Sequence, residues 1–327
     1  MTAMHPDVAV PGFLHMIYPY DGEQQYLSGT LAYIEHARSA GGTVIVAVPP
    51  QRKESLSAQL GSNDGVSFVD TEALGRNPGR LIPAWQDWIG QLAREGAVHG
   101  INESVFAGRS PAHHGEVRYQ EWLLNLAFAQ APALALMCPV DTSGQQPQAV
   151  QALTRCHPLL WNGAACVPGT AYIDDAYSFE PLTEPYEPYE QMAYDVGSLQ
   201  AVRQKTTGWA LMHRLPLARA RALTLAVSEV ATNSIRYGGG RGTLRLWREG
   251  GALVCELRDT GVITDPMVGR IRPSSDQIGG RGLWFVNQLC DLVQIRSAPG
   301  DGTRIRLWLD LPVDGPGASA EPSRADA

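Results

Sequence analysis

The sequence predicts two domains, the first of the α/β class and the second of the α+β class. In residues 12–170, short β-branched or aromatic runs alternate with segments of helical apolar spacing, a pattern typical of a mostly parallel sheet with helices on both faces. In residues 195–312, a long amphipathic segment precedes four strand-like runs, as in a sheet of antiparallel hairpins. A chain of 327 residues is also about twice the usual size of one domain.

The first half contains six strand signals and three helix signals. The strand runs are short and bounded by Gly, Pro or polar residues, and the helices have apolar residues three or four apart. No G-x-x-x-x-G-K-[ST] motif occurs among them, which argues against a phosphate-binding P-loop. The predicted strands are Phe13–Tyr18, Thr43–Val48, Val66–Val69, Val98–Asn102, Ala133–Cys138 and Leu159–Trp161, and the predicted helices are Gln24–Ala40, Leu81–Arg94 and Glu116–Ala129.

Composition excludes several classes of function. The formal net charge of −7 is opposite to that of a nucleic-acid-binding surface, so we expect no direct nucleic-acid partner. The sequence has no apolar stretch long enough to span a membrane and no basic leader followed by an apolar run, so we expect a cytoplasmic protein without a membrane partner. The five cysteines include no C-x-x-C pair, which favours buried thiols over disulfides or a zinc site.

An acidic, proline-containing stretch separates the two domains. Residues 174–190 carry six acidic side chains, three prolines and no basic residue, and proline disfavours regular helix. We therefore predict a linker over residues 171–194, although an acidic strip that docks on one domain would have the same composition. Residues 313–327 are small, polar and rich in Pro and Gly, which predicts a disordered tail.

The most informative pair of residues lies on the helix predicted for Arg219–Tyr237. Its apolar residues occupy one arc, and Glu229 and Asn233 stack one turn apart at the edge of that arc. A carboxylate and an amide in this position are expected to face a cleft. A lone E-x-x-x-N is more often a solvated surface pair, so the motifs that follow it decide the interpretation.

Three further motifs follow in order. Asp259-Thr260-Gly261 ends a predicted hairpin, where an Asp can accept from an exocyclic amine and Gly261 lets the turn approach a flat ring. The glycine-rich run 279–283 then begins a helix, whose free N–H groups attract phosphate. A Gly-Thr pair precedes the final strand. The predicted elements are the strands Thr243–Trp247 and Ala252–Asp259, the helix Leu283–Cys290, and the strands Leu292–Ala298 and Thr303–Leu311.

In this order, the four motifs resemble the N, G1, G2 and G3 boxes of the GHKL ATPase and kinase superfamily. The matching stretches are LAVSEVATNSIRYG, VCELRDTG, GGRGLWFVNQLCDLVQI and GTRIRLWL. Within the superfamily, residues 195–311 look like the anti-sigma serine kinases of bacterial partner-switching systems. The resemblance implies a two-layer α+β sandwich that binds ATP and Mg²⁺.

The same resemblance implies a role for each matched residue. Asn233 would ligate Mg²⁺, and Glu229 would be the general base for the attacking hydroxyl. Asp259 would bind the adenine amine, with Gly261 shaping the pocket and Thr303 supporting Asp259. The phosphates would lie against Gly279, Gly280, Arg281, Gly282 and Leu283, with Arg270, Arg272 or Arg281 as charged neighbours.

Residues 12–168 resemble the MEDS sensory domain of bacterial and archaeal regulators. The matching stretches are FLHMIYPYDGEQQYL, VHGINESVFAG, EVRYQEWLLNLA and LTRCHPLLWNG. The resemblance implies a sensor for an unspecified small ligand. A histidine at a strand end is more often explained by an ordinary backbone hydrogen bond than by a ligand. The polar residues that we place near a ligand pocket are His15, Glu103, Arg109, Glu116 and His157.

Three functions fit these expectations. The first is a sensor-gated serine/threonine kinase that sequesters an alternative sigma factor and phosphorylates an anti-anti-sigma protein of the STAS fold. The second is a non-catalytic regulator in which ATP sets partner affinity, which the intact Glu229 disfavours. The third is a two-component histidine kinase, but residues 195–214 offer only His213 and are too short for a two-helix acceptor domain. Whether the chain forms a homodimer does not follow from the sequence.

Overall fold

Two compact units make up the part of the chain that the computed structural model describes. The described residues are 12–62, 65–71, 74–92, 96–104, 110–131, 133–173, 180–274 and 280–312. The first unit contains the residues up to 182 and the segment 263–288, and the second contains 183–262 and the residues from 289 onwards. The segment 263–288, which includes the glycine-rich run, is therefore grouped with the N-terminal sheet.

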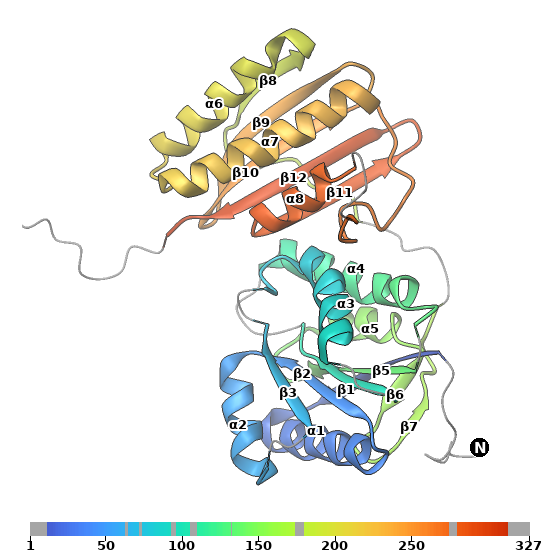
Figure 1. Cartoon of the computed structure of the whole chain (residues 1–327). Helices are drawn as coiled ribbons and strands as arrows, with labels where there is room; N and C mark the ends of the chain where they lie inside the picture. Colours follow the sequence, from blue (N-terminus) through green and yellow to red (C-terminus); the bar gives the residue numbers. More distant parts are fainter. Residues whose placement is uncertain are drawn as a thin grey trace, which may run out of the picture. The chain divides into compact units, whose positions relative to one another are not determined.

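A seven-stranded sheet forms the centre of the first unit (Figure 1). Its strand order is β3-β2-β4-β5-β1-β6-β7, and the neighbouring strands are parallel except for the β6–β7 pair. The predicted α/β class with a mostly parallel sheet is confirmed. The strands are β1 (Phe13–Tyr20), β2 (Thr43–Val48), β3 (Val66–Asp70), β4 (Val98–Asn102), β5 (Leu134–Asp141), β6 (Leu159–Trp161) and β7 (Cys166–Pro168).

Helices cover both faces of this sheet. They are α1 (Gly22–Ser39), α2 (Pro50–Leu60), α3 (Leu81–Leu92), α4 (Pro111–Ala127) and α5 (Pro147–Thr154), with the short turn η1 (Pro78–Arg80) before α3. Helices α1 and α2 bury Tyr33 and Leu56 in one core, and α3 and α4 bury Trp85 and Leu123 in another on the opposite face (Figure 1). Because both faces are covered, the strands are nearly continuous apolar runs rather than alternating ones.

The sequence does not predict helices α2 and α5. Leu56 is the buried residue of α2, and Leu153 is that of α5, so neither helix has the long apolar stripe by which helices are recognised. Helix α4 begins at Pro111 rather than at the predicted Glu116. Proline is favoured in the first turn, where its missing N–H would have no helical partner.

A five-stranded antiparallel sheet forms the centre of the second unit, with the order β11-β12-β10-β9-β8. Helices α6 and α7 lie together on one face of this sheet (Figure 1). The predicted α+β class is confirmed, and the arrangement is GHKL-like. The elements are β8 (Glu190–Asp195), η2 (Val196–Ser198), α6 (Leu199–Met212), α7 (Leu217–Tyr237), β9 (Arg241–Glu249), β10 (Ala252–Asp259), β11 (Leu292–Ala298) and β12 (Gly302–Asp310), and α8 (Gly282–Leu289) belongs mostly to the first unit.

Part of the predicted linker packs on the second unit. Strand β8 pairs with β9, which extends the sheet by one edge strand. The carboxylate of Glu184 accepts hydrogen bonds from Arg245 at 2.7 Å, Arg258 at 2.9 Å and Arg304 at 3.3 Å. These contacts hold Glu184 against three arginines of the five-stranded sheet. In the described ranges, no helix is both long enough and apolar enough to cross a membrane.

Candidate functional site

Helix α7 places Glu229 and Asn233 one turn apart on the border of its buried stripe. The stripe residues beside them, Ala226 and Val230, are almost fully buried, and α7 contacts strands β9, β10 and β12. Glu229 and Asn233 themselves are half-buried, and within the described residues neither side chain has a hydrogen-bond or ion-pair partner. Their side-chain oxygen atoms are therefore open acceptors. An oxygen that binds a cation or accepts a hydrogen bond from a hydroxyl group must be open in this way.

Asp259 lies at the end of β10, where hydrogen bonds fix its carboxylate. Oδ2 accepts from the Ser234 hydroxyl at 2.6 Å, and Oδ1 accepts from the backbone N–H of Gly261 at 2.8 Å. The phenol of Tyr194 donates to Ser234 Oγ at 3.0 Å. Because an ionised carboxylate has about four lone-pair positions, Asp259 is oriented by its neighbours and can still accept from an amine.

Gly261 and Thr303 shape the turn after Asp259. A Cβ at Gly261 would lie 2.7 Å from the carbonyl oxygen of Tyr237, so the backbone that follows α7 requires glycine here. The hydroxyl of Thr303 donates to the carbonyl of Gly261 at 2.8 Å. Thr303 and Asp259 are partners in the β10–β12 register. The predicted support of Asp259 by Thr303 therefore acts on the turn rather than on the carboxylate.

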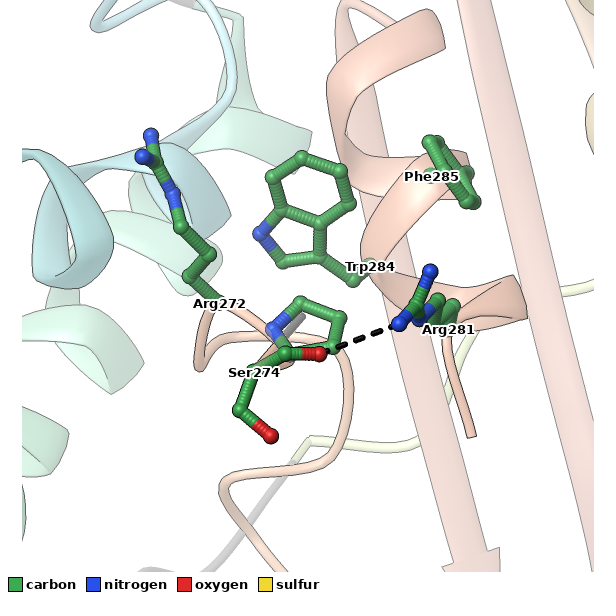
Figure 2. A pocket seen from close by; sticks show the side chains of 6 residues that line it. Arg272, Ser274, Arg281, Trp284 and Phe285 are labelled. Carbon is green, nitrogen blue, oxygen red and sulfur yellow. Dashed lines mark hydrogen bonds between the residues drawn. The ribbon is translucent and has the colours of Figure 1, made fainter. Parts of the chain in front are cut away.

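In the first unit, the described part of the glycine-rich run begins at Gly280, and Gly279 lies outside the described residues. Gly280 has a φ of 72°, in the left-handed region that favours glycine. Arg281, Trp284 and Arg272 help to line an open pocket of about 400 Å³ (Figure 2). Figure 2 shows Arg281 donating to the carbonyl of Ser274, at 3.0 Å. The guanidinium of Arg281 beside the first turn of α8 (Figure 2) makes this pocket suitable for an anion.

The arginines before α8 differ in their surroundings. Arg270 is buried, and it pairs with Glu116 at 3.2 Å and donates to Gln120 at 2.8 Å, both on α4. Arg272 is exposed and pairs with Asp87 of α3 at 2.5 Å. Arg270 is therefore committed to α4, whereas Arg272 and Arg281 line the pocket.

Helix α8 is also held by the turn η1. Arg80 donates through Nε to the carbonyl of Asn287 at 2.8 Å and through Nη2 to that of Gln288 at 3.0 Å. The side-chain amide of Asn77 donates to the same Asn287 carbonyl at 2.9 Å. Leu283, predicted to lie beside phosphate, is buried in this region. The last carbonyl groups of α8 are thus satisfied by residues that belong to the seven-stranded domain.

Two of the residues predicted for the sensory pocket, His15 and His157, meet inside the first unit. Their rings lie 4.1 Å apart between centroids. The Nε2 atoms of His15 and His157 lie 3.2 Å and 3.4 Å from Oε2 of Glu121. All three side chains are fully buried or nearly so. Burial, together with the neighbouring His157, lowers the pKa of His15 to about 4.

The other predicted sensory residues lie elsewhere. Glu103 accepts from the phenol of Tyr26 at 3.0 Å and faces Arg52 at 3.4 Å, and burial raises its pKa. Glu116 pairs with Arg270, as described above. Arg109 lies outside the described residues. The structure therefore unites two of the predicted residues with Glu121, which the sequence analysis did not select.

The motifs and their geometry define two kinds of domain, a GHKL-like α+β domain and a parallel α/β domain. Two family models agree with this division. Residues 192–309 match the family model described as a histidine kinase-like ATPase domain, and residues 14–158 match the model described as MEDS, the methanogen/methylotroph, DcmR sensory domain. The chain is thus a fusion of a MEDS domain with a GHKL-type ATPase domain. No curated protein matches it.

Proposed function

We propose that this protein is a sensor-gated anti-sigma factor with serine/threonine kinase activity. It would bind Mg-ATP, phosphorylate an anti-anti-sigma protein of the STAS fold, and sequester an alternative sigma factor. The observation that carries the kinase proposal is the pair Glu229 and Asn233, which is half-buried, one turn apart and without protein partners in the described residues. The resemblance of the N, G1, G2 and G3 motifs to anti-sigma kinases supports the choice of partners.

The side chains of the proposed site are chemically suited to Mg²⁺ and ATP. Asn233 would hold Mg²⁺ through its amide oxygen, which is a hard donor of the kind that this ion prefers. Asp259 would accept from the adenine amine, and Arg281 would neutralise phosphate charge together with the first N–H groups of α8. In the transfer, the partner's hydroxyl oxygen bonds to the γ-phosphorus, the bond to the β–γ bridging oxygen breaks, ADP leaves, and Glu229 accepts the hydroxyl proton.

Contacts within the first unit support gating by the sensory domain. Arg270, in the segment before α8, is bonded to α4, and the end of α8 is bonded to η1. A ligand that shifted α4 or η1 would therefore also shift the residues proposed to hold phosphate. The coupling would be a differential stability of two arrangements of the segment 263–288, which is the physical requirement for regulation by a ligand.

One observation disfavours the histidine-kinase alternative. His213, its only candidate acceptor, directly follows α6 and stacks edge-on against Trp209 at 5.0 Å between ring centroids. Helix α6 packs on α7 and lies within the match to the ATPase domain. A two-helix acceptor domain would need further helices between β8 and α6, and the described chain has only η2 there.

The decisive experiment uses purified full-length protein, radiolabelled ATP with Mg²⁺, and candidate STAS proteins from the same genome. We expect Glu229→Gln to lower transfer at least 100-fold while the affinity for ATP changes little. Asn233→Ala should weaken Mg-ATP binding itself. Arg221→Ala, an exposed change on the same helix, is the matched control and should leave transfer intact.

Three outcomes would contradict the proposal. Transfer that survives Glu229→Gln would remove the base assignment. ATP binding with no transfer to any STAS protein would favour the non-catalytic regulator. Label on His213, lost in His213→Gln, would identify a histidine kinase.

A further inference from the structure

Four metal-ligating side chains converge in the interior of the first unit. His15 is on β1, Cys138 is on β5, Glu121 is on α4 and His157 follows α5. Each is at most 2% exposed. Their ligand atoms, two imidazole nitrogens, a carboxylate oxygen and a thiol sulfur, all lie within 4.8 Å of one another. The residues come from four separate segments, so the cluster is a product of the fold.

The outer hydrogen bond of His15 fixes the proton on its ring. Nδ1 of His15 lies 3.0 Å from Oδ1 of Asn125. The amide nitrogen of Asn125 donates to the carbonyl of Cys156 at 2.8 Å, which leaves Oδ1 as the atom that faces His15. Because Oδ1 is an acceptor, Nδ1 carries a proton. Nε2 is then the ring nitrogen that points into the cluster, and it is the atom that could ligate a metal ion.

His157 has the same arrangement. Its Nδ1 lies 2.8 Å from the carbonyl oxygen of Leu153, and a carbonyl can only accept. Nε2 of His157 therefore points into the cluster as a second nitrogen, and it has no hydrogen-bond partner among the described residues. Both Nε2 atoms face the same carboxylate oxygen, Oε2 of Glu121, at 3.2 Å and 3.4 Å. If one proton lay between Oε2 and one of the two Nε2 atoms, the second Nε2 atom would still face Oε2.

We propose that this cluster binds one divalent transition-metal ion of the Zn²⁺ or Fe²⁺ type. The ligands are Nε2 of His15, Nε2 of His157, Oε2 of Glu121 and Sγ of Cys138. An ion of this type forms bonds of about 2.0–2.3 Å to N, O and S, which places tetrahedral ligand atoms roughly 3.3–3.6 Å apart. The distances from Glu121 Oε2 to the two histidines, and the 3.4 Å from His15 Nε2 to Cys138 Sγ, are close to these separations.

The residues around the four ligands match those of metal centres. Metal-binding histidines donate their other N–H to an amide or carbonyl oxygen, as His15 and His157 do with Asn125 and Leu153. The second oxygen of Glu121 accepts from Ser104 and from the amide of Asn102, at 3.3 Å for Asn102, which orients Oε2 toward the cluster. Binding releases the thiol proton of Cys138 to solvent. Four protein ligands and complete burial describe a closed site.

The metal site does not depend on the proposed kinase activity. The test uses full-length protein that has been stripped with a chelator under reducing conditions and titrated with Co²⁺, then with Zn²⁺. We expect one Co²⁺ per chain, the strong visible absorption of a tetrahedral ion, and a thiolate-to-metal charge-transfer band. One equivalent of Zn²⁺ should remove both signals.

Variants separate this site from adventitious binding. Cys138→Ser should abolish the charge-transfer band, and His157→Ala should weaken Co²⁺ binding at least 100-fold. Asn125→Ala removes only an outer hydrogen bond and should weaken binding about 10–100-fold. Cys166→Ser changes a thiol of the same domain outside the cluster and is the matched control, expected to bind as the unmodified chain does.

X-ray absorption of the zinc-loaded, unmodified chain keeps the proposal testable if a variant fails to fold. It should give one sulfur neighbour at about 2.3 Å and three nitrogen or oxygen neighbours at about 2.0 Å. Absence of stoichiometric Co²⁺ or Zn²⁺ uptake would overturn the proposal, as would a zinc neighbour shell without sulfur or a charge-transfer band that persists in Cys138→Ser. The cluster would then be a buried hydrogen-bond network.

Discussion

Two pairs of polar side chains, one pair in each domain, differ in their surroundings. In the ATPase domain, Glu229 and Asn233 are half-buried and have no partner among the described residues. In the MEDS domain, Glu116 and Glu121 are almost fully buried, and each faces partners of complementary chemistry. A substrate that binds and dissociates needs polar groups that are accessible and unpaired. An ion or a structural ion pair that is held permanently needs closed surroundings.

From this difference we predict how substitutions in the two domains change the free energy of unfolding. Removal of one member of a buried pair lowers the stability of the fold, because the other member is left desolvated without a partner. Half-buried groups without partners contribute to function and little to stability. The following substitutions test this contrast through the free energy of unfolding of the full chain.

The largest loss is expected for Glu116→Ala. It leaves the buried guanidinium of Arg270, 4% exposed, without its carboxylate, and such changes lower the free energy of unfolding by about 3–5 kcal/mol. Urea denaturation followed by tryptophan fluorescence measures the loss. The double variant Glu116→Leu with Arg270→Met, which removes both charges, should recover most of the stability. A loss below about 1 kcal/mol in the single variant would show that the pair is solvated.

The second-largest effect is a loss of folding stability at acidic pH, caused by His99. Burial, with a smaller contribution from His36, lowers the pKa of His99 from 6.5 to about 4 in the folded chain. The unfolded chain therefore binds the proton more readily, so stability is full above pH 6.5 and falls as the pH drops toward 4. A shift of this size corresponds to roughly 2–3 kcal/mol at pH 4. Unfolding free energies at several pH values should show a shallower decline for His99→Gln, and equal slopes in the two chains would refute the assignment.

A smaller loss is expected for Thr303→Val. The change preserves the shape of the side chain but leaves the carbonyl of Gly261 without the hydroxyl that donates to it at 2.8 Å. Loss of one such hydrogen bond lowers the free energy of unfolding by about 1 kcal/mol. Thr232→Val, whose hydroxyl bonds only to a carbonyl of its own helix, is the comparison and should change stability by less than about 0.5 kcal/mol. Equal losses in both variants would mean that the turn after Asp259 does not depend on Thr303.

The smallest effect on stability is expected for Glu229→Ala. The side chain has no partner among the described residues, so the free energy of unfolding should stay within about 0.5 kcal/mol of that of the unmodified chain. The same protein sample should have lost phosphoryl transfer. A loss comparable to that of Glu116→Ala would remove the contrast between the domains, since it would make Glu229 a structural residue.

The ATPase half could be predicted from the sequence because its signals are local. Glu229 and Asn233 are four residues apart on one helix, and the helix pattern alone places them on the same edge. Gly261 is necessary because its backbone lies close to the carbonyl of Tyr237, the last residue of α7. This approach could not be predicted, since it depends on how a strand end meets a helix end. The β8 strand was hidden in an acidic, proline-containing segment whose composition favours a linker.

The buried cluster of the MEDS domain could not be found from spacing. His15 lies 106 residues from Glu121 and 123 from Cys138, whereas the recognisable zinc motifs place ligands a few residues apart. The absence of a C-x-x-C pair therefore says little about a site assembled from β1, α4 and β5. Glu116 was expected in the same pocket as the histidines, but it contacts Arg270, whereas Glu121 of the same helix contacts the histidine pair.

The hydrogen bonds from Arg80 and Asn77 to the end of α8 have a practical consequence for dissecting the chain. A fragment cut at the apparent domain boundary, for example beginning at residue 183, retains α8 and the segment before it but loses Arg80, Asn77 and Glu116. Arg270, which is buried in the full chain, would then be exposed to solvent without Glu116. The last turn of α8 would fray. Assays on such an excised ATPase would describe a molecule in which Arg270 and the end of α8 have lost contacts of the full chain.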